Sequence, residues 1–246
     1  HMKKPSYFDG GLLQLIGWRL LGGIITSITF GFAAPWAVVM IKKWEMKHTV
    51  INGKRLHFDG YGGQLFGKYI VWILLTFITF GIYSLWLAIK MKKWVVKHTL
   101  LCSNDEAKEL EALEEELKQE KKNNNAIRVE ELTKQIDAYR NSHKISGDSK
   151  FDSGLLGLIG HNILSILIIA FSFGIATPFA VCIKQSWETK HTIINGKRLT
   201  FKGKGTNLLG KFVLWILLSV VTFGIYLLWI SIKMKKWVIK NTDFID

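Results

Sequence analysis

The chain repeats one pattern four times, and this repetition constrains its fold more than any other feature. Each copy has a long apolar run, a Phe-Gly step, and a second segment that ends in lysines. The glycines of the four steps are Gly31, Gly81, Gly174 and Gly224. They are 50 positions apart within each pair, and Trp44 and Trp187 are 143 positions apart, so a tandem pair was duplicated as a block. This arrangement predicts two homologous halves with pseudo-twofold symmetry.

The first segment of each copy is almost as long and apolar as a membrane-spanning helix. Runs such as Leu12 to Phe30 contain few polar residues, and about 16 to 19 residues give roughly 24 to 28 Å of helix against ~30 Å of hydrocarbon. Four such runs, in a chain that is 49% hydrophobic, favour a membrane protein over a large soluble core. Glycine at each Phe-Gly step weakens the helix, and Pro35 and Pro178 suit the first turn of a returning helix. The pattern predicts four helical hairpins with the four glycines in their turns.

The charge distribution predicts a topology. The Phe-Gly turns carry no charged residue, whereas the other connections are rich in lysine. The positive-inside rule therefore places the lysine side, with both termini, on the cytoplasmic face of the membrane. A net charge of +14 at one face predicts anionic lipids as partners. Tryptophans are interleaved with these basic residues, which argues against nucleic acid and favours interfacial anchors. The predicted anchors are Trp44, Trp94, Trp187 and Trp237.

The chain divides into three parts: membrane repeat pairs at residues 3–101 and 151–246, and a charged insert at residues 102–150. Asn52-Gly53 and Asn195-Gly196 predict short β-hairpin connectors between repeats. The insert has leucine-spaced helical segments on either side of Asn123 to Asn125, which predicts a cytoplasmic helical hairpin. Its narrow apolar stripe would pack on itself or on a neighbouring subunit, which leaves a homo-oligomer open, and a solvated spacer is the alternative. The predicted fold class is an all-α integral membrane protein with about eight membrane-embedded helices in four hairpins.

A family resemblance rests on an ensemble of short motifs. These are an aromatic-Asp-Gly step, the helix start Gly63-Gln64-Leu65-Phe66-Gly67, a Thr-Phe-Gly-Ile-Tyr-x-x-Trp turn, a basic cluster, and His-Thr before a hairpin. Together they resemble the YjgN-like family of bacterial inner-membrane proteins over about four fifths of the chain. The insert, and lysines where that family tends to have arginines, depart from it. The resemblance implies a bacterial multi-pass membrane protein and no chemistry.

The depth of the lysines separates two functional hypotheses. Lys43 lies eight residues after Pro35, so about 12 Å along the second helix. A lysine at mid-membrane costs at least ~2.5 to 3.5 kcal/mol. Lysines on one helix face recur in the second and fourth copies, and with Lys43 they form the predicted anion or lipid site: Lys90, Lys93, Lys233 and Lys236. They would line the cytoplasm-facing cavity of a channel or transporter. Alternatively, the hairpins would lie as wedges in one leaflet of a membrane-shaping scaffold that assembles through the insert.

The sequence gives little support to an enzyme. His48, His98 and His191 recur before threonine, but the pattern shows no carboxylate partner that recurs with them. Asp9, Asp59 and Asp152 also recur, yet the fourth copy has Lys202 in their place. Only two cysteines are present, without paired spacing. We therefore predict no catalytic residue, no metal site and no cofactor.

Overall fold

The computed structural model describes residues 4–144 and 148–245, and each repeat in it is a strand, two helices and a second strand. The first repeat contains β1 (Tyr7–Phe8), α1 (Leu12–Ile28), α2 (Ala34–Lys47) and β2 (Thr49–Ile51). The second contains β3 (Lys54–Phe58), α3 (Gly62–Ile78), α4 (Ser84–Lys97) and β4 (Thr99–Cys102). The third contains β5 (Lys150–Phe151), α7 (Leu155–Phe171), α8 (Thr177–Lys190) and β6 (Thr192–Ile194). The fourth contains β7 (Lys197–Phe201), α9 (Gly205–Val221), α10 (Leu227–Lys240) and β8 (Thr242–Phe244).

Two small antiparallel sheets hold the repeats together. Their strand orders are β1-β2-β3-β4 and β5-β6-β7-β8. Asn52 and Gly53 have positive φ angles of 49° and 74°, as a tight two-residue hairpin turn requires, and they join β2 to β3. Leu56, Leu101 and Leu199 belong to one buried cluster that draws on both sheets. The two halves therefore share one core at their base.

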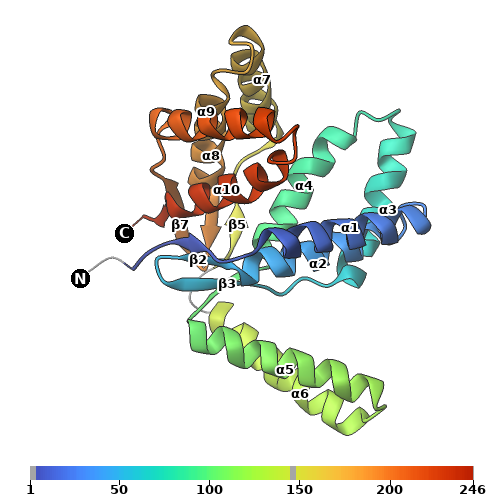
Figure 1. The fold of residues 1–246 in the computed structure, drawn as a ribbon. Coiled ribbons are helices and arrows are strands. Elements are labelled where there is room, and N and C mark those ends of the chain that lie inside the picture. Colours follow the sequence, from blue (N-terminus) through green and yellow to red (C-terminus); the bar gives the residue numbers. More distant parts are fainter. Residues whose placement is uncertain (1–3, 145–147, 246) are drawn as a thin grey trace.

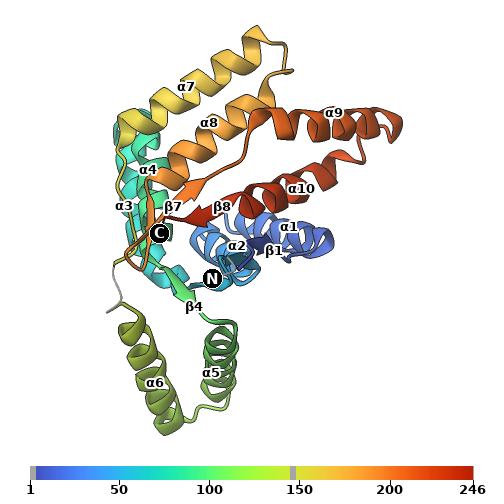
Figure 2. The ribbon, with the colours of Figure 1, turned by 90° about the vertical axis from the view of Figure 1, so that its left-hand side faces the viewer.

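The four helical hairpins form a closed circle above this base. Neighbours within a half touch through α2 and α3, and through α8 and α9. The halves touch through α1 with α10 and through α4 with α7. Figures 1 and 2 show the hairpins fanning out from the sheets, with the insert leaving on another side. The exposed surface is 14349 Å², against roughly 11,000 Å² expected for a compact monomer of this mass. The excess reflects the splayed hairpins.

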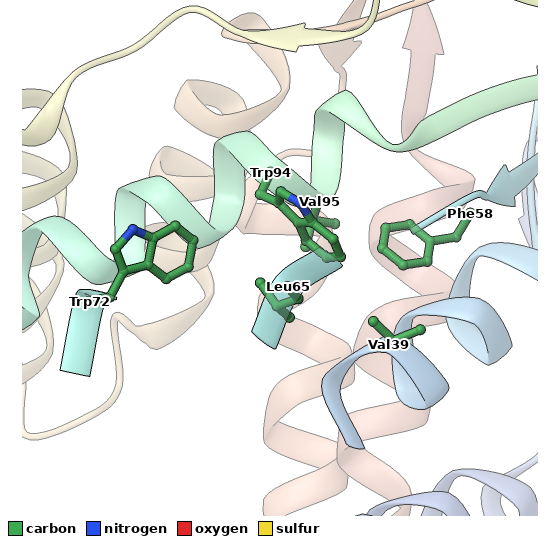
Figure 3. Close-up of a cluster of buried hydrophobic side chains, with 6 residues drawn as sticks. All are labelled: Val39, Phe58, Leu65, Trp72, Trp94 and Val95. Atoms are coloured by element: carbon green, nitrogen blue, oxygen red, sulfur yellow. The ribbon is translucent and has the colours of Figure 1, made fainter. Parts of the chain in front are cut away.

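Each repeat is held by an aromatic pair at its base. Phe58 of β3 meets Trp94 of α4 edge to face, with ring centroids 5.6 Å apart. A side chain at Gly60 would lie 2.6 Å from Phe58 and 2.7 Å from Trp94, so only glycine fits there. Figure 3 shows Val39 of α2 and Leu65 of α3 in the same cluster, which also includes Trp72 and Val95. The first hairpin thus completes the core of the second.

The insert is a helical hairpin of α5 (Asn104–Lys122) and α6 (Ala126–Lys144), with the chain reversing at the asparagines between them. Ser103 caps α5 by accepting a hydrogen bond from the Glu106 backbone, while the Glu106 carboxylate accepts one from the Ser103 backbone. Leu110, Leu132 and Ile136 are buried. The insert contacts β3 and β4, so it docks on the first half of the chain.

The prediction of an all-α integral membrane protein is wrong. Across residues 4–144 and 148–245, none of the helices combines the length and the apolar character needed to cross a bilayer. The first helix of each hairpin has 17 residues, about 25 Å against ~30 Å of hydrocarbon. The second helix has 14 residues and carries lysines from its middle onward. The prediction counted the turn residues into the helices, and it did not foresee two four-stranded sheets.

Candidate functional site: the hairpin tips and the central cluster

The hairpin tips, residues 29–33, 79–83, 172–176 and 222–226, share one strained geometry. Their four glycines have φ angles between 86° and 89°. The phenylalanine before each glycine also has a positive φ, between 49° and 51°, which is rare for a bulky residue. These phenylalanines are 94% to 98% exposed: Phe30, Phe80, Phe173 and Phe223. Four exposed aromatic rings on strained backbone mark the tips as candidate contact surfaces.

A hydroxyl group makes each tip rigid. In the first hairpin, the Thr29 hydroxyl donates to the Ile25 carbonyl at 2.8 Å and accepts from the Ala33 backbone N–H at 3.0 Å. Thr79, Ser172 and Thr222 make the same pair of bonds in the other hairpins. The last turn of one helix is thereby fixed to the first turn of the next, so the phenylalanine ring is presented outward.

On the first helix of three of the four hairpins, a cation precedes the exposed apolar stretch that leads to the tip. On α1 this stretch begins at Leu20, directly after the exposed Arg19, and continues to Phe30. This interval of ten residues corresponds to about 15 Å of helix. The exposed Lys68 and Lys211 occupy comparable places on α3 and α9, before the exposed apolar residues of those helices. The apolar depth is thus close to half of the ~30 Å hydrocarbon thickness, or one leaflet.

Charged residues of the second helices meet between the halves in a central cluster, defined here as Lys42, Glu45, Lys92, Lys184, Glu188 and Lys235. Glu45 of α2 accepts from Lys42 at 2.8 Å and from Lys235 of α10 at 2.7 Å. Glu188 of α8 pairs with Lys92 of α4 at 2.5 Å. Four lysines therefore face two glutamates, and the cluster has an excess of positive charge.

Burial and this charge balance shift the pKa values in the central cluster. Burial alone would raise the pKa of Glu45, but Lys42 and Lys235 together lower it to about 2. Burial lowers the pKa of Lys92; the partner Glu188 opposes this shift, and Lys184 adds to it. Burial likewise lowers the pKa of Lys235. The surroundings therefore favour the ionised form of Glu45 and disfavour the charged forms of Lys92 and Lys235.

The lysines predicted from the sequence do not meet in one cavity. Lys90 and Lys233 fold back over Tyr83 and Tyr226 of their own hairpins. Lys93 and Lys236 are exposed, and Lys43 faces the insert instead, with its ammonium 3.7 Å from Glu114. The residues that converge lie one position earlier, at Lys42, Lys92 and Lys235. Glu45 and Glu188, the acidic residues of the second helices, were the available sequence signal for this register.

The predicted tryptophan anchors are core residues. Each of the four is only 5% to 8% exposed: Trp44, Trp94, Trp187 and Trp237. Each packs edge to face on the phenylalanine at the start of its repeat. The interfacial role is therefore corrected: the aromatic-Asp-Gly step and the tryptophan are two halves of one contact.

Two of the three histidines that precede a threonine do have a carboxylate partner, contrary to the sequence-based expectation. His98 lies 2.8 Å from Asp59, and His191 lies 2.7 Å from Asp152. The partners are 39 positions apart, which no local pattern reveals. In the fourth repeat Lys202 pairs with Asp243 at 2.5 Å, so an ion pair is kept with changed residues. In the second, third and fourth repeats, these pairs tie the start of the helical hairpin to the end of its second helix or to the strand that follows.

Comparison with known proteins gives a family match for one of the four repeats. Residues 53–105 match the family described as bacterial protein of unknown function (DUF898). The second repeat is thus similar to this family. The YjgN-like family is the DUF898 family, so the resemblance found in the sequence is confirmed for these residues. The match begins at the Asn-Gly turn and ends just inside the insert, so it covers one strand-hairpin-strand unit. No curated protein and no solved structure matches the chain.

Proposed function

We propose that this protein binds the surface of a membrane by placing its four hairpin tips in one leaflet. The observation that carries the proposal is the fourfold display of an almost fully exposed phenylalanine at the tips. A monomer rarely exposes so much contiguous apolar surface unless the surface contacts lipid or a partner. The apolar depth of about 15 Å fits one leaflet, and it needs no helix that crosses the bilayer.

The charges fit the same position. Lys42 lies eight residues beyond the start of α2, so about 12 Å from the tip, at nearly the depth of Arg19. The central cluster would therefore lie at the level of the lipid phosphates, where its excess positive charge favours anionic headgroups. The exposed Lys93 and Lys236 would extend this basic layer. Such a composition favours the cytoplasmic leaflet of a bacterial inner membrane, and wedge-like insertion would shape the bilayer.

A depth measurement tests this proposal. A cysteine placed at Ile82 in the second tip, with Cys102 and Cys182 replaced by alanine, would carry an environment-sensitive fluorophore. We expect its emission to shift to the blue with vesicles that contain phosphatidylglycerol, and lipid-borne quenchers to place it within one leaflet. A cysteine at Ile127, which is exposed on the insert, is the matched control and should show no shift. Equal spectra for both positions would refute the proposal.

The anionic preference is tested at the central cluster. Lys184→Gln removes one excess positive charge and leaves the ion pairs of Glu45 and Glu188 in place. We expect weaker binding to anionic vesicles and unchanged binding to neutral ones. Lys134→Gln on the insert, an exposed lysine, should change neither. A Lys184→Gln protein with the lipid preference of the wild type would remove the cluster from the proposal.

A further inference from the structure

A cleft of about 1290 Å³ separates the first hairpin from the insert. Its walls come from α1 and α2 on one side and from α5 and α6 on the other. Figure 1 shows that the α1/α2 hairpin and the insert leave the sheets in similar directions and diverge. The proposed membrane contact at the hairpin tips does not use this space.

One carboxylate in the cleft, that of Glu114, lies among several cationic side chains. Glu114 accepts from Arg140 at 2.9 Å, and it lies 3.3 Å from His57 and 3.7 Å from Lys43. Arg140 is only 6% exposed, and its Nε has no hydrogen-bond partner among the described residues. Burial would raise the pKa of Glu114, yet its neighbours lower it to about 2. One negative charge therefore serves several donors, and positive charge is left over.

The excess of positive charge continues along the cleft. Seven lysine and arginine residues line it, against three glutamates. Besides Arg140, they are Lys43 and Lys47 of α2 and Lys108, Lys118, Lys121 and Lys122 of α5. Apolar side chains lie among these charges, including Trp18, Met40 and Leu117. A cleft with this lining matches a ligand that has an anionic group and a small apolar part.

The internal duplication supplies a comparison. At an offset of 143 positions, Trp18 becomes His161 and Lys43 becomes Ser186 in the third repeat. The described residues of the second half, 148–245, contain no helical insert. Trp18 and Lys43 line the cleft beside the insert, and the third repeat, which has no such insert, has other residues at the matching positions. The fold of the repeat therefore does not require these two side chains.

We propose that this cleft binds an organic phosphate, with the phosphate near Lys43, Lys47 and Lys108 and the organic part against Trp18 and Met40. A phosphate monoester carries between one and two negative charges near neutral pH, which suits the local excess better than a single carboxylate. Lysine ammonium groups bind phosphate as mobile point charges, so they need no fixed fork geometry. A free metabolite and a lipid headgroup share this chemistry.

Isothermal titration calorimetry on the full chain tests the proposal with two probes, glycerol 3-phosphate and monomeric dihexanoyl phosphatidic acid. We expect saturable binding of at least one probe. The double variant Lys43→Gln/Lys47→Gln should bind at least about tenfold more weakly, because charge-assisted hydrogen bonds are lost. Lys190→Gln, the counterpart of Lys47 in the third repeat, is the matched control and should bind like the wild type.

The outcomes are distinct. Equal affinities for the two probes would indicate a free phosphate ligand, and tighter binding of the phosphatidic acid would indicate a lipid headgroup. If circular dichroism shows that the double variant is unfolded, Lys108→Gln decides the question, since it lines the cleft from α5. Absence of binding for both probes, or wild-type affinity in the lysine variants, would overturn the proposal. A protein that binds a probe but not vesicles would keep this cleft and refute only the membrane contact.

Discussion

Replacing the four tip phenylalanines by asparagine should separate membrane binding from stability. Phe30 and its three counterparts are at least 94% exposed, so their rings make almost no contact in the folded protein. Their backbone has φ near 50°, where asparagine is favoured and a bulky residue costs about 1 kcal/mol. We therefore expect the Phe→Asn variants to be at least as stable as the wild type. Most substitutions of four phenylalanines would have the opposite effect.

The loss of membrane affinity should be large. Transfer of one phenylalanine side chain from water is worth about 1.5 to 3 kcal/mol. Since 1.4 kcal/mol corresponds to a factor of ten, each tip should contribute about 10- to 140-fold in vesicle affinity. Sedimentation with phosphatidylglycerol-containing vesicles measures the affinity, and differential scanning fluorimetry measures the stability. Ile127→Asn removes an apolar side chain that is 83% exposed on the insert, and it serves as the control.

Two results would refute this reasoning. If the variant with all four substitutions binds vesicles as tightly as the wild type, the exposed rings do not enter lipid. If its melting temperature falls by several degrees, the rings are packed in solution, either on each other or on a second copy, and their exposure in the monomer is not the relevant state.

Three further predictions concern the base of the molecule. Glu45→Gln leaves two half-buried lysines without their carboxylate and should cost about 1.5 to 3 kcal/mol. Because the folded pKa of Glu45 is about 2, the wild type should lose this stability only as the pH falls from about 4.5 to 2. Chemical denaturation across that pH window measures the loss. Asn195→Ala should lower the free energy of unfolding by about 2 to 4 kcal/mol. The Asn195 side chain accepts a hydrogen bond from the buried Leu101 N–H across the two halves, and Asn195 itself has a positive φ. A loss of stability no larger than that of an exposed substitution would contradict the role of this bond. Deletion of residues 105–144 with a short flexible linker should leave vesicle binding intact and abolish binding of whichever phosphate probe the wild type binds. Loss of vesicle binding would show that the insert belongs to the membrane contact.

Local sequence reasoning succeeded where the structure follows from neighbouring residues. The Phe-Gly steps, the Asn-Gly turns and the reversal at Asn123 to Asn125 are set by φ preferences and by breaks in apolar periodicity, and the chain turns at each of them. It failed for the tryptophans and histidines, because their partners lie 36 to 39 positions away. A tryptophan beside lysines resembles an interfacial anchor when the phenylalanine that buries it lies 36 positions away in the sequence.

The sequence by itself determined the repeat, the hairpins and the apolar character of their tips, since these depend on residue types and spacing within one unit. Only the tertiary structure decided which lysines meet. Lys42, Lys92 and Lys235 converge because the two halves pack around a shared core and turn these residues toward Glu45 and Glu188, while Lys90 and Lys233 fold over their own tyrosines. A rotation of about 100° per residue separates neighbouring positions on a helix. Contacts between distant segments set how each second helix is rotated in the packing. This rotation decides which of two neighbouring lysines points toward the glutamates.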